Sequence, residues 1–152
     1  MKALTIQSEN LDLTFKNTDK VFPNGKCNYP HAKPVYEKLF KEYNERKGTE
    51  YNEFFWAFSN LLTDDKHEAI ERAREMIGME NDKNNKILIL DVPDNLCLAT
   101  DFYNFADEIY AHEFPNELKS VWNSIFDVRE NSETQVIFPY ISKEMVVEVL
   151  EK

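Results

Sequence analysis

Glycine is scarce in this sequence. The 152 residues contain three glycines, Gly25, Gly48 and Gly78. A dinucleotide-binding turn needs the spacing GxGxxG, and a P-loop needs GxxxxGK followed by Ser or Thr, because only glycine lets the backbone approach phosphates closely. Neither spacing is present. The sequence therefore disfavours a Rossmann or P-loop nucleotide enzyme.

Cysteine and histidine are nearly as rare, with two and three residues respectively. Cys27 and Cys97 form no CxxC pair, and the histidines form no HxxxH or Cys/His cluster, so no zinc site is predicted. There is no GxSxG elbow, and no serine or cysteine stands in a recognisable nucleophile context. Cys97 lies in an apolar run, which is typical of a buried free thiol. An enzyme is therefore the less favoured class.

Long apolar runs and excess basic charge are also missing. No run approaches the ~18 residues of a membrane span, and no secretory signal pattern is present, which predicts a protein of the reducing cytoplasm without membrane contact. Acidic residues outnumber basic ones by 28 to 18, for a net charge of −10. That charge repels phosphate backbones, so direct nucleic-acid binding is not expected. It suits a basic protein surface, although many cytoplasmic proteins are acidic without such a partner.

The sequence does contain enough apolar residues for one core. Hydrophobic residues make up 42% of the chain, and aromatic residues make up 13% of it. A chain of this length predicts one domain over residues 1–152. Period-2 and apolar runs predict strands, and three-to-four spacing predicts helices. The expected strands are 2–7, 53–58, 86–92, 95–100 and 134–141, and the expected helices are 33–48, 64–78, 101–110, 114–128 and 142–150. The predicted fold is α+β: a mixed twisted sheet with four or five helices packed on it.

Several residues are candidates for a ligand-binding site, and each of them also has a purely structural interpretation. Thr100 and Asp101 stand between a strand and a helix, where either can cap the helix or contribute to a ligand site. His31 lies in a long loop, and loops often carry function. Trp56 belongs to an aromatic run that either lines a ring-binding pocket or fills the core. Glu108 and His112 have i,i+4 spacing and are expected to form an exposed pair.

The order of segments resembles a bacterial family of unknown function, DUF 3841. The matching pieces are "LTIQ", "PVYEKLFKEYNERKG" followed by "FFWAF", "ILILDVPDNLCLATDF", and "SVWNSIFDV" with "TQVIF" after it. The family favours a tryptophan shortly after the Asp101 position and another near Tyr36. Here "FYNFAD" and "YEKLF" stand instead. The resemblance implies a divergent member and brings no established activity.

A fainter resemblance is to small ADP-ribosyltransferase-like domains. It rests on the strand "LTIQ", a helix with an aromatic near its start, an aromatic strand and "ILILDVP". Such domains bind NAD in a cleft between two short sheets, using a His or Arg on the first strand. Thr5 or Gln7 occupies that position here, and no Ser-Thr-Ser strand is present. The resemblance implies a cleft containing Thr5, Gln7, Trp56 and His31, with a depleted catalytic set.

Two hypotheses follow. The leading one is a small acidic binding or regulatory protein that acts through protein contacts and needs no cofactor; a concrete version is a phage or mobile-element inhibitor that occupies the nucleic-acid groove of its partner. The alternative is an ADP-ribosyltransferase-like domain that binds NAD or a related nucleotide. Candidate ligand-binding residues are Thr5, Gln7, His31, Trp56 and Asp101.

Overall fold

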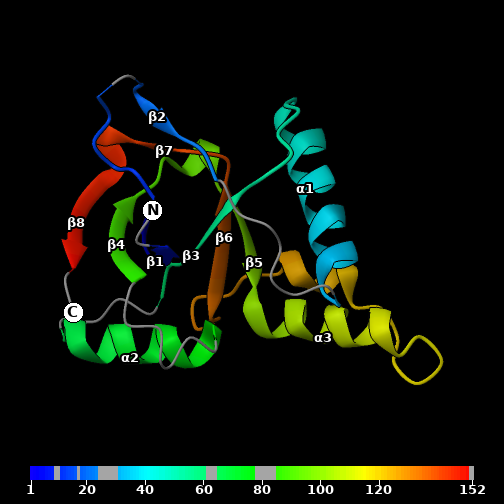
Figure 1. The fold of residues 1–152 in the computed structure, drawn as a ribbon. Helices are drawn as coiled ribbons and strands as arrows, with labels where there is room; N and C mark the ends of the chain where they lie inside the picture. The colour runs from blue at the N-terminus through cyan, green and yellow to red at the C-terminus, as the bar shows by residue number, and fades with distance from the viewer. Residues whose placement is uncertain (9–10, 17, 24–30, 61–64, 78–84, 151–152) are drawn as a thin grey trace.

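The computed structural model describes residues 1–8, 11–16, 18–23, 31–60, 65–77 and 85–150. Within them the fold is α+β, as predicted, with one six-stranded sheet and one two-stranded sheet (Figure 1). The large sheet consists of β1 (Lys2–Ser8), β3 (Phe55–Phe58), β4 (Asn85–Asp91), β5 (Leu98–Asp101), β6 (Thr134–Phe138) and β8 (Val146–Leu150). The small sheet pairs β2 (Lys20–Val21) with β7 (Ile141–Ser142). The α-helices are α1 (Lys33–Lys47), α2 (Lys66–Ile77) and α3 (Phe102–Glu113).

The strands of the large sheet lie in the order β5-β6-β3-β1-β4-β8. Every described pair of neighbours is antiparallel, so the prediction of a mixed sheet was wrong. Parallel neighbours need a long crossover connection, which is usually a helix. The strands that α2 connects, β3 and β4, do run parallel, but β1 lies between them and is antiparallel to both. Insertion of β1 therefore gives two antiparallel pairs in place of a parallel one.

Two of the five expected helices do not form, so the described residues contain three α-helices. The expected helix 142–150 is a 3-10 turn, η3 (Lys143–Met145), followed by the strand β8. The valines of this segment have side chains that favour extended backbone when a neighbouring strand is available, and β4 supplies that neighbour. The expected helix 114–128 contains only the 3-10 helix η2 (Trp122–Phe126), after an exposed segment. Trp122 is half-buried there, and Ile125 is the buried side chain.

The other helices begin within two residues of their predicted starts, and α3 runs to Glu113, three residues past its predicted end. Pro34 lies in the first turn of α1, and Gly48 ends the helix with a left-handed φ of 66°. Asp65 accepts a hydrogen bond from the Glu68 backbone N–H at the start of α2. Asp101 caps α3. Gly25, Gly78 and Cys27 lie outside the described residues.

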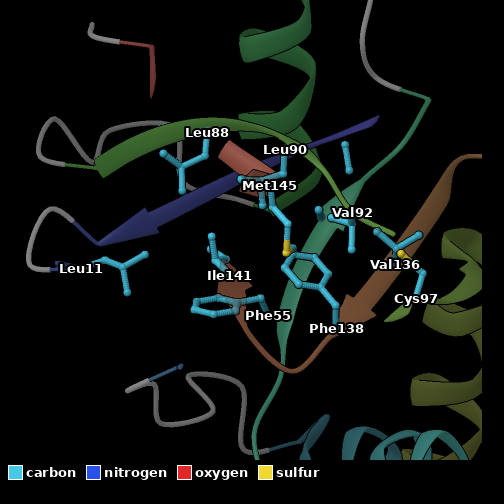
Figure 2. Packing of buried hydrophobic residues seen from close by; sticks show 12 residues of the cluster. Leu11, Phe55, Leu88, Leu90, Val92, Cys97, Val136, Phe138, Ile141 and Met145 are labelled. Atoms are coloured by element: carbon cyan, nitrogen blue, oxygen red, sulfur yellow. The ribbon is translucent and has the colours of Figure 1, made fainter. Parts of the chain in front are cut away.

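The two faces of the large sheet are buried differently. One face packs against the chain segments around β7 and η3, in the cluster that Figure 2 shows, and Cys97 is buried in this cluster as predicted. The opposite face is covered by helices. There α1, α3 and η2 cover the β5, β6 and β3 side, while α2 covers the β1 and β4 side. Figure 1 shows α1 at one side of the fold. One face of α1 is buried in the core, and the opposite face is exposed.

Candidate functional site

Three of the five predicted site residues lie together where β1 and β3 separate. The two strands pair through Leu4 and Phe58. Beyond this pair, the Thr5 hydroxyl donates a hydrogen bond to the Trp56 carbonyl. The Gln7 side-chain amide in turn donates to Thr5 Oγ1 at 2.8 Å. The side chains of Thr5 and Gln7 thus act as a bridge between diverging strands.

The Trp56 ring lies against α1 and forms part of the core. It stacks on Tyr36 with 4.6 Å between ring centroids and 9° between planes. Its indole nitrogen is buried without a hydrogen-bond partner, and so is the side-chain nitrogen of Gln135, a residue 1% exposed. Trp56 therefore fits the core interpretation of the aromatic run.

Asp101 and His31 are not part of this group. Asp101 Oδ1 accepts a hydrogen bond from the Asn104 backbone N–H at 2.9 Å, which is the capping role. Asp101 ends β5, and two strands separate β5 from β1, which places it ~14 Å from Thr5 across the sheet. His31 is exposed just before α1. The structure does not gather the five residues into one cleft.

A surface groove lies elsewhere, along the exposed face of α1. We call it the α1 groove. Its volume is about 610 Å³. It is lined by Glu37, Phe40, Lys41, Asn44, Glu45, Thr49, Glu50, Tyr51 and Asn52. The helix forms one wall and the segment after Gly48 forms the other, so the groove exists because the chain turns back beside the helix that it has just left.

Asn44 holds the two walls together. Its side-chain oxygen accepts hydrogen bonds from the Thr49 hydroxyl at 2.8 Å and the Tyr51 backbone N–H at 3.0 Å. Its side-chain nitrogen donates to the Tyr51 carbonyl at 2.8 Å. The left-handed Gly48 permits the reversal of direction between them. The groove is therefore preformed rather than dependent on a ligand.

Aromatic rings form the groove's apolar part. The Phe40 ring stacks on the buried Phe54 ring at 4.6 Å between centroids. The Tyr51 ring meets the same Phe54 ring edge-on, at 6.3 Å and 77°. These contacts fix both rings against the core while leaving part of each ring at the groove. Half-buried rings next to carboxylates are suited to hold the cation of a Lys or Arg side chain.

The charge that lines the groove is acidic. Three carboxylates, on Glu37, Glu45 and Glu50, face one ammonium, on Lys41. Lys41 Nζ is 4.0 Å from Glu45 and is thus already close to a carboxylate. Glu37 has a similar neighbour in Lys33, at 3.9 Å. Both pairs are exposed and weak, so an incoming cation can compete with them.

A smaller hollow of about 320 Å³ lies at the end of α3. It is lined by Asp107, Tyr110, Leu118, Lys119 and Val121. The carboxylate of Glu108 supports it from beneath by accepting hydrogen bonds from the Ser120 hydroxyl, at 2.8 and 3.0 Å, and from the Val121 backbone N–H, at 2.6 Å. Glu108 is buried, so the expected exposed pair with His112 was wrong. The hydrogen bonds to residues 12 and 13 positions away draw its side chain inward.

None of the five predicted site residues lines either hollow. Sequence reasoning missed Asn44 and Tyr51. One signal was available: Asn44 follows Phe40 by one helical turn and Gly48 follows Asn44 by another. A polar amide four residues before a helix stop can bond to the segment that follows the stop.

Comparison with known proteins found no family model, curated protein or solved structure that matches the chain. The resemblances to DUF 3841 and to ADP-ribosyltransferase-like domains remain predictions from the sequence. Among the described residues, no three His, Cys, Asp or Glu side chains are grouped so as to hold a metal ion. No helix in the described part of the chain is long and apolar enough to cross a membrane.

Proposed function

We propose that this protein binds a basic segment of a partner protein in the α1 groove. The observation that carries the proposal is a preformed groove in which three carboxylates surround two half-buried aromatic rings. Lys and Arg side chains match both features, because their cations pair with carboxylates and their stems or cations pack on rings. The net charge of −10 adds long-range attraction for such a partner.

A preformed groove favours binding energetically. The segment Thr49–Tyr51 is already held by Asn44, so little ordering of the protein is required when a peptide arrives. The exposed carboxylates of Glu37 and Glu50 chiefly accelerate association, and the aromatic contacts slow dissociation. We propose that the partner is a cytoplasmic protein with a basic surface, such as the nucleic-acid groove of a host protein blocked by a phage or mobile-element inhibitor.

The test is titration of a fluorescein-labelled peptide of alternating Arg and Gly residues, followed by anisotropy at 50 and 300 mM NaCl. The variant Glu37→Gln/Glu50→Gln removes two groove charges. We expect its Kd to rise about tenfold at 50 mM NaCl and less at 300 mM, because salt screens exposed charges. A peptide with Gln in place of Arg should not bind.

The matched control is Glu75→Gln/Glu130→Gln, which changes the net charge equally. Glu75 is exposed on α2, which covers a different part of the sheet, and Glu130 is exposed in the turn before β6. We expect the control to change Kd by less than about twofold. Equal effects of the two double variants would mean that only net charge attracts the peptide, and the groove assignment would be wrong.

The nucleotide hypothesis makes a different prediction. In an ADP-ribosyltransferase-like cleft, Thr5 and Gln7 would bind NAD, yet here their side chains hydrogen-bond to each other and to the Trp56 carbonyl. We therefore expect millimolar NAD to leave the melting temperature unchanged. A ligand at 100 times its Kd stabilises by ~2.7 kcal/mol, so a rise of several degrees would favour the nucleotide hypothesis over the peptide one.

A further inference from the structure

The β8 strand forms an open edge of the large sheet. It is the last strand in the order β5-β6-β3-β1-β4-β8 and pairs with β4 on one side (Figure 1). Proteins usually block such edges with proline, with lysine, with an inward-pointing charge or with a β-bulge. Residues Val146–Leu150 include neither proline nor lysine. The other edge strand, β5, is four residues long and packs against η2, so it is less available.

Apolar side chains lie on the open edge. Val147 is 53% exposed and Val149 is 46% exposed, and they alternate with Glu148. Val149 pairs with Leu88, so it shares the sheet face that contains the core cluster of Figure 2. The register shifts between the pairs Ile89–Glu148 and Leu90–Val146, so a β-bulge leaves Val147 without a partner on β4, and Glu148–Leu150 is the regular part of the edge. The edge therefore carries a short apolar row along one face.

The single charge within this row is neutralised by the protein itself. Lys66 Nζ lies 2.6 and 2.8 Å from the two carboxylate oxygens of Glu148. Lys66 is the first residue of α2, on the opposite face of the sheet from the exposed valines. A carboxylate held by a lysine does not repel an identical carboxylate as an isolated one would.

We propose that β8 pairs with the β8 strand of a second copy of this chain, in an antiparallel arrangement with two-fold symmetry. With Glu148 on the axis, Val147 of each copy lies opposite Val149 of the other. The four valines form one apolar patch, and the two Lys66–Glu148 pairs form a cluster of zero net charge. The two six-stranded sheets then become one continuous sheet.

A second copy fits this edge better than a basic partner does. The exposed face of the edge offers apolar contact. Its one carboxylate lies 2.6 and 2.8 Å from Lys66 Nζ, closer than the 3.9 and 4.0 Å ion pairs of the α1 groove, so it attracts a cation less than that groove does. The pairing places apolar side chains opposite apolar side chains and brings together two ion pairs of zero net charge. Two chains that each carry a net charge of −10 repel each other, so added salt should strengthen dimerisation by screening this repulsion. Added salt should weaken the binding of a basic peptide, which depends on attraction between opposite charges. The two proposals can therefore fail independently.

The test is sedimentation equilibrium of the full chain at 50 and 500 mM NaCl, over protein concentrations up to about 1 mM. We expect a monomer–dimer equilibrium whose Kd falls about tenfold or more at the higher salt. In the variant Val147→Lys/Val149→Lys we expect a Kd at least about 100-fold weaker, because two cations from each copy meet in the patch. The matched control is Tyr103→Lys/Tyr110→Lys, which replaces two exposed residues of α3 and changes the net charge by the same amount. It should dimerise like the original chain.

Hydrogen exchange of the original chain provides a reading that needs no variant. Backbone amides within Val147–Leu150 should exchange more slowly as protein concentration rises, while those of α1 should not change. A monomer at every concentration and salt would overturn the proposal. So would a dimer that survives in Val147→Lys/Val149→Lys, or a dimer without protection in β8, since either result would place the interface elsewhere.

Discussion

Asp101 shows how one side chain can settle the junction between a strand and a helix. It ends β5, and its carboxylate oxygen accepts the Asn104 backbone N–H at 2.9 Å in the first turn of α3. The neighbouring Thr100 is buried, and its hydroxyl is 3.5 Å from the Gln135 carbonyl. Asp101 therefore takes the capping position that the sequence left open between the two residues.

The capping role predicts a difference between two substitutions. Asp101→Ala removes the acceptor and should lower the free energy of unfolding by about 0.5–2 kcal/mol. Asp101→Asn retains an amide oxygen that can accept the same hydrogen bond, so its stability should stay close to that of the original chain. Urea denaturation measures both. If the asparagine variant loses as much stability as the alanine variant, the negative charge matters more than the hydrogen bond.

At the scale of elements, α3 and the segment that follows it are held together by Glu108. Residues 112–120 are exposed throughout, and Phe114 and Leu118 are large apolar residues among them. The buried Glu108 carboxylate connects this segment back to the helix through Ser120 and Val121. One acidic side chain thus substitutes for the continuous helix that the apolar spacing of 114–128 predicted.

Removal of this carboxylate should loosen the segment. Glu108→Ala leaves the Val121 N–H and the Ser120 hydroxyl without their acceptor, which should cost about 1–3 kcal/mol of unfolding free energy. Hydrogen exchange at Val121 should accelerate while α1 stays protected. Glu117→Ala, an exposed change in the same segment, should stay within about 0.5 kcal/mol. Equal loss in both variants would show that Glu108 is not the anchor.

At the scale of the whole molecule, two buried ionisable side chains affect the response to alkaline pH. Burial raises the pKa of the Cys97 thiol to about 11. Burial also raises the pKa of Tyr43, whose hydroxyl donates to the Leu96 carbonyl at 2.7 Å. Both side chains keep their protons in the folded protein at pH values where the unfolded chain loses them. Above the unfolded pKa of a thiol, the unfolded state therefore binds fewer protons than the folded state.

Stability should consequently fall as pH rises from about 9 to 11, because ionisation is then favoured only on unfolding. Urea denaturation at pH 7, 9 and 10.5 measures the fall. Cys97→Ala should be less stable at every pH because it opens a small cavity, but its decline with pH should be shallower. Part of the decline in stability should remain in this variant, because burial also raises the pKa of Tyr43. Equal slopes for the two proteins would show that Cys97 does not couple to unfolding.

Local signals in the sequence were sufficient wherever a structural feature depends on residues close together in the chain. Pro34 and Gly48 delimit α1, and Asp101 starts α3, because caps act within one helical turn. The acidic charge and the lack of phosphate-binding glycines are properties of composition and need no fold. The fold class followed from the alternation of strand and helix patterns.

Tertiary structure decided what depends on neighbours distant in the chain. Val146–Leu150 is compatible with helix or strand, and β4 makes it a strand by offering an open edge. The side chains of Thr5 and Gln7 form hydrogen bonds that link β1 to β3. The buried Glu108 carboxylate accepts a hydrogen bond from Val121, a residue 13 positions later that helical spacing would not pair with it. The α1 groove likewise requires the chain after Gly48 to return beside its own helix. Such features arise from the pairing of whole elements, and that pairing is set by the burial of the complete core rather than by any local pattern.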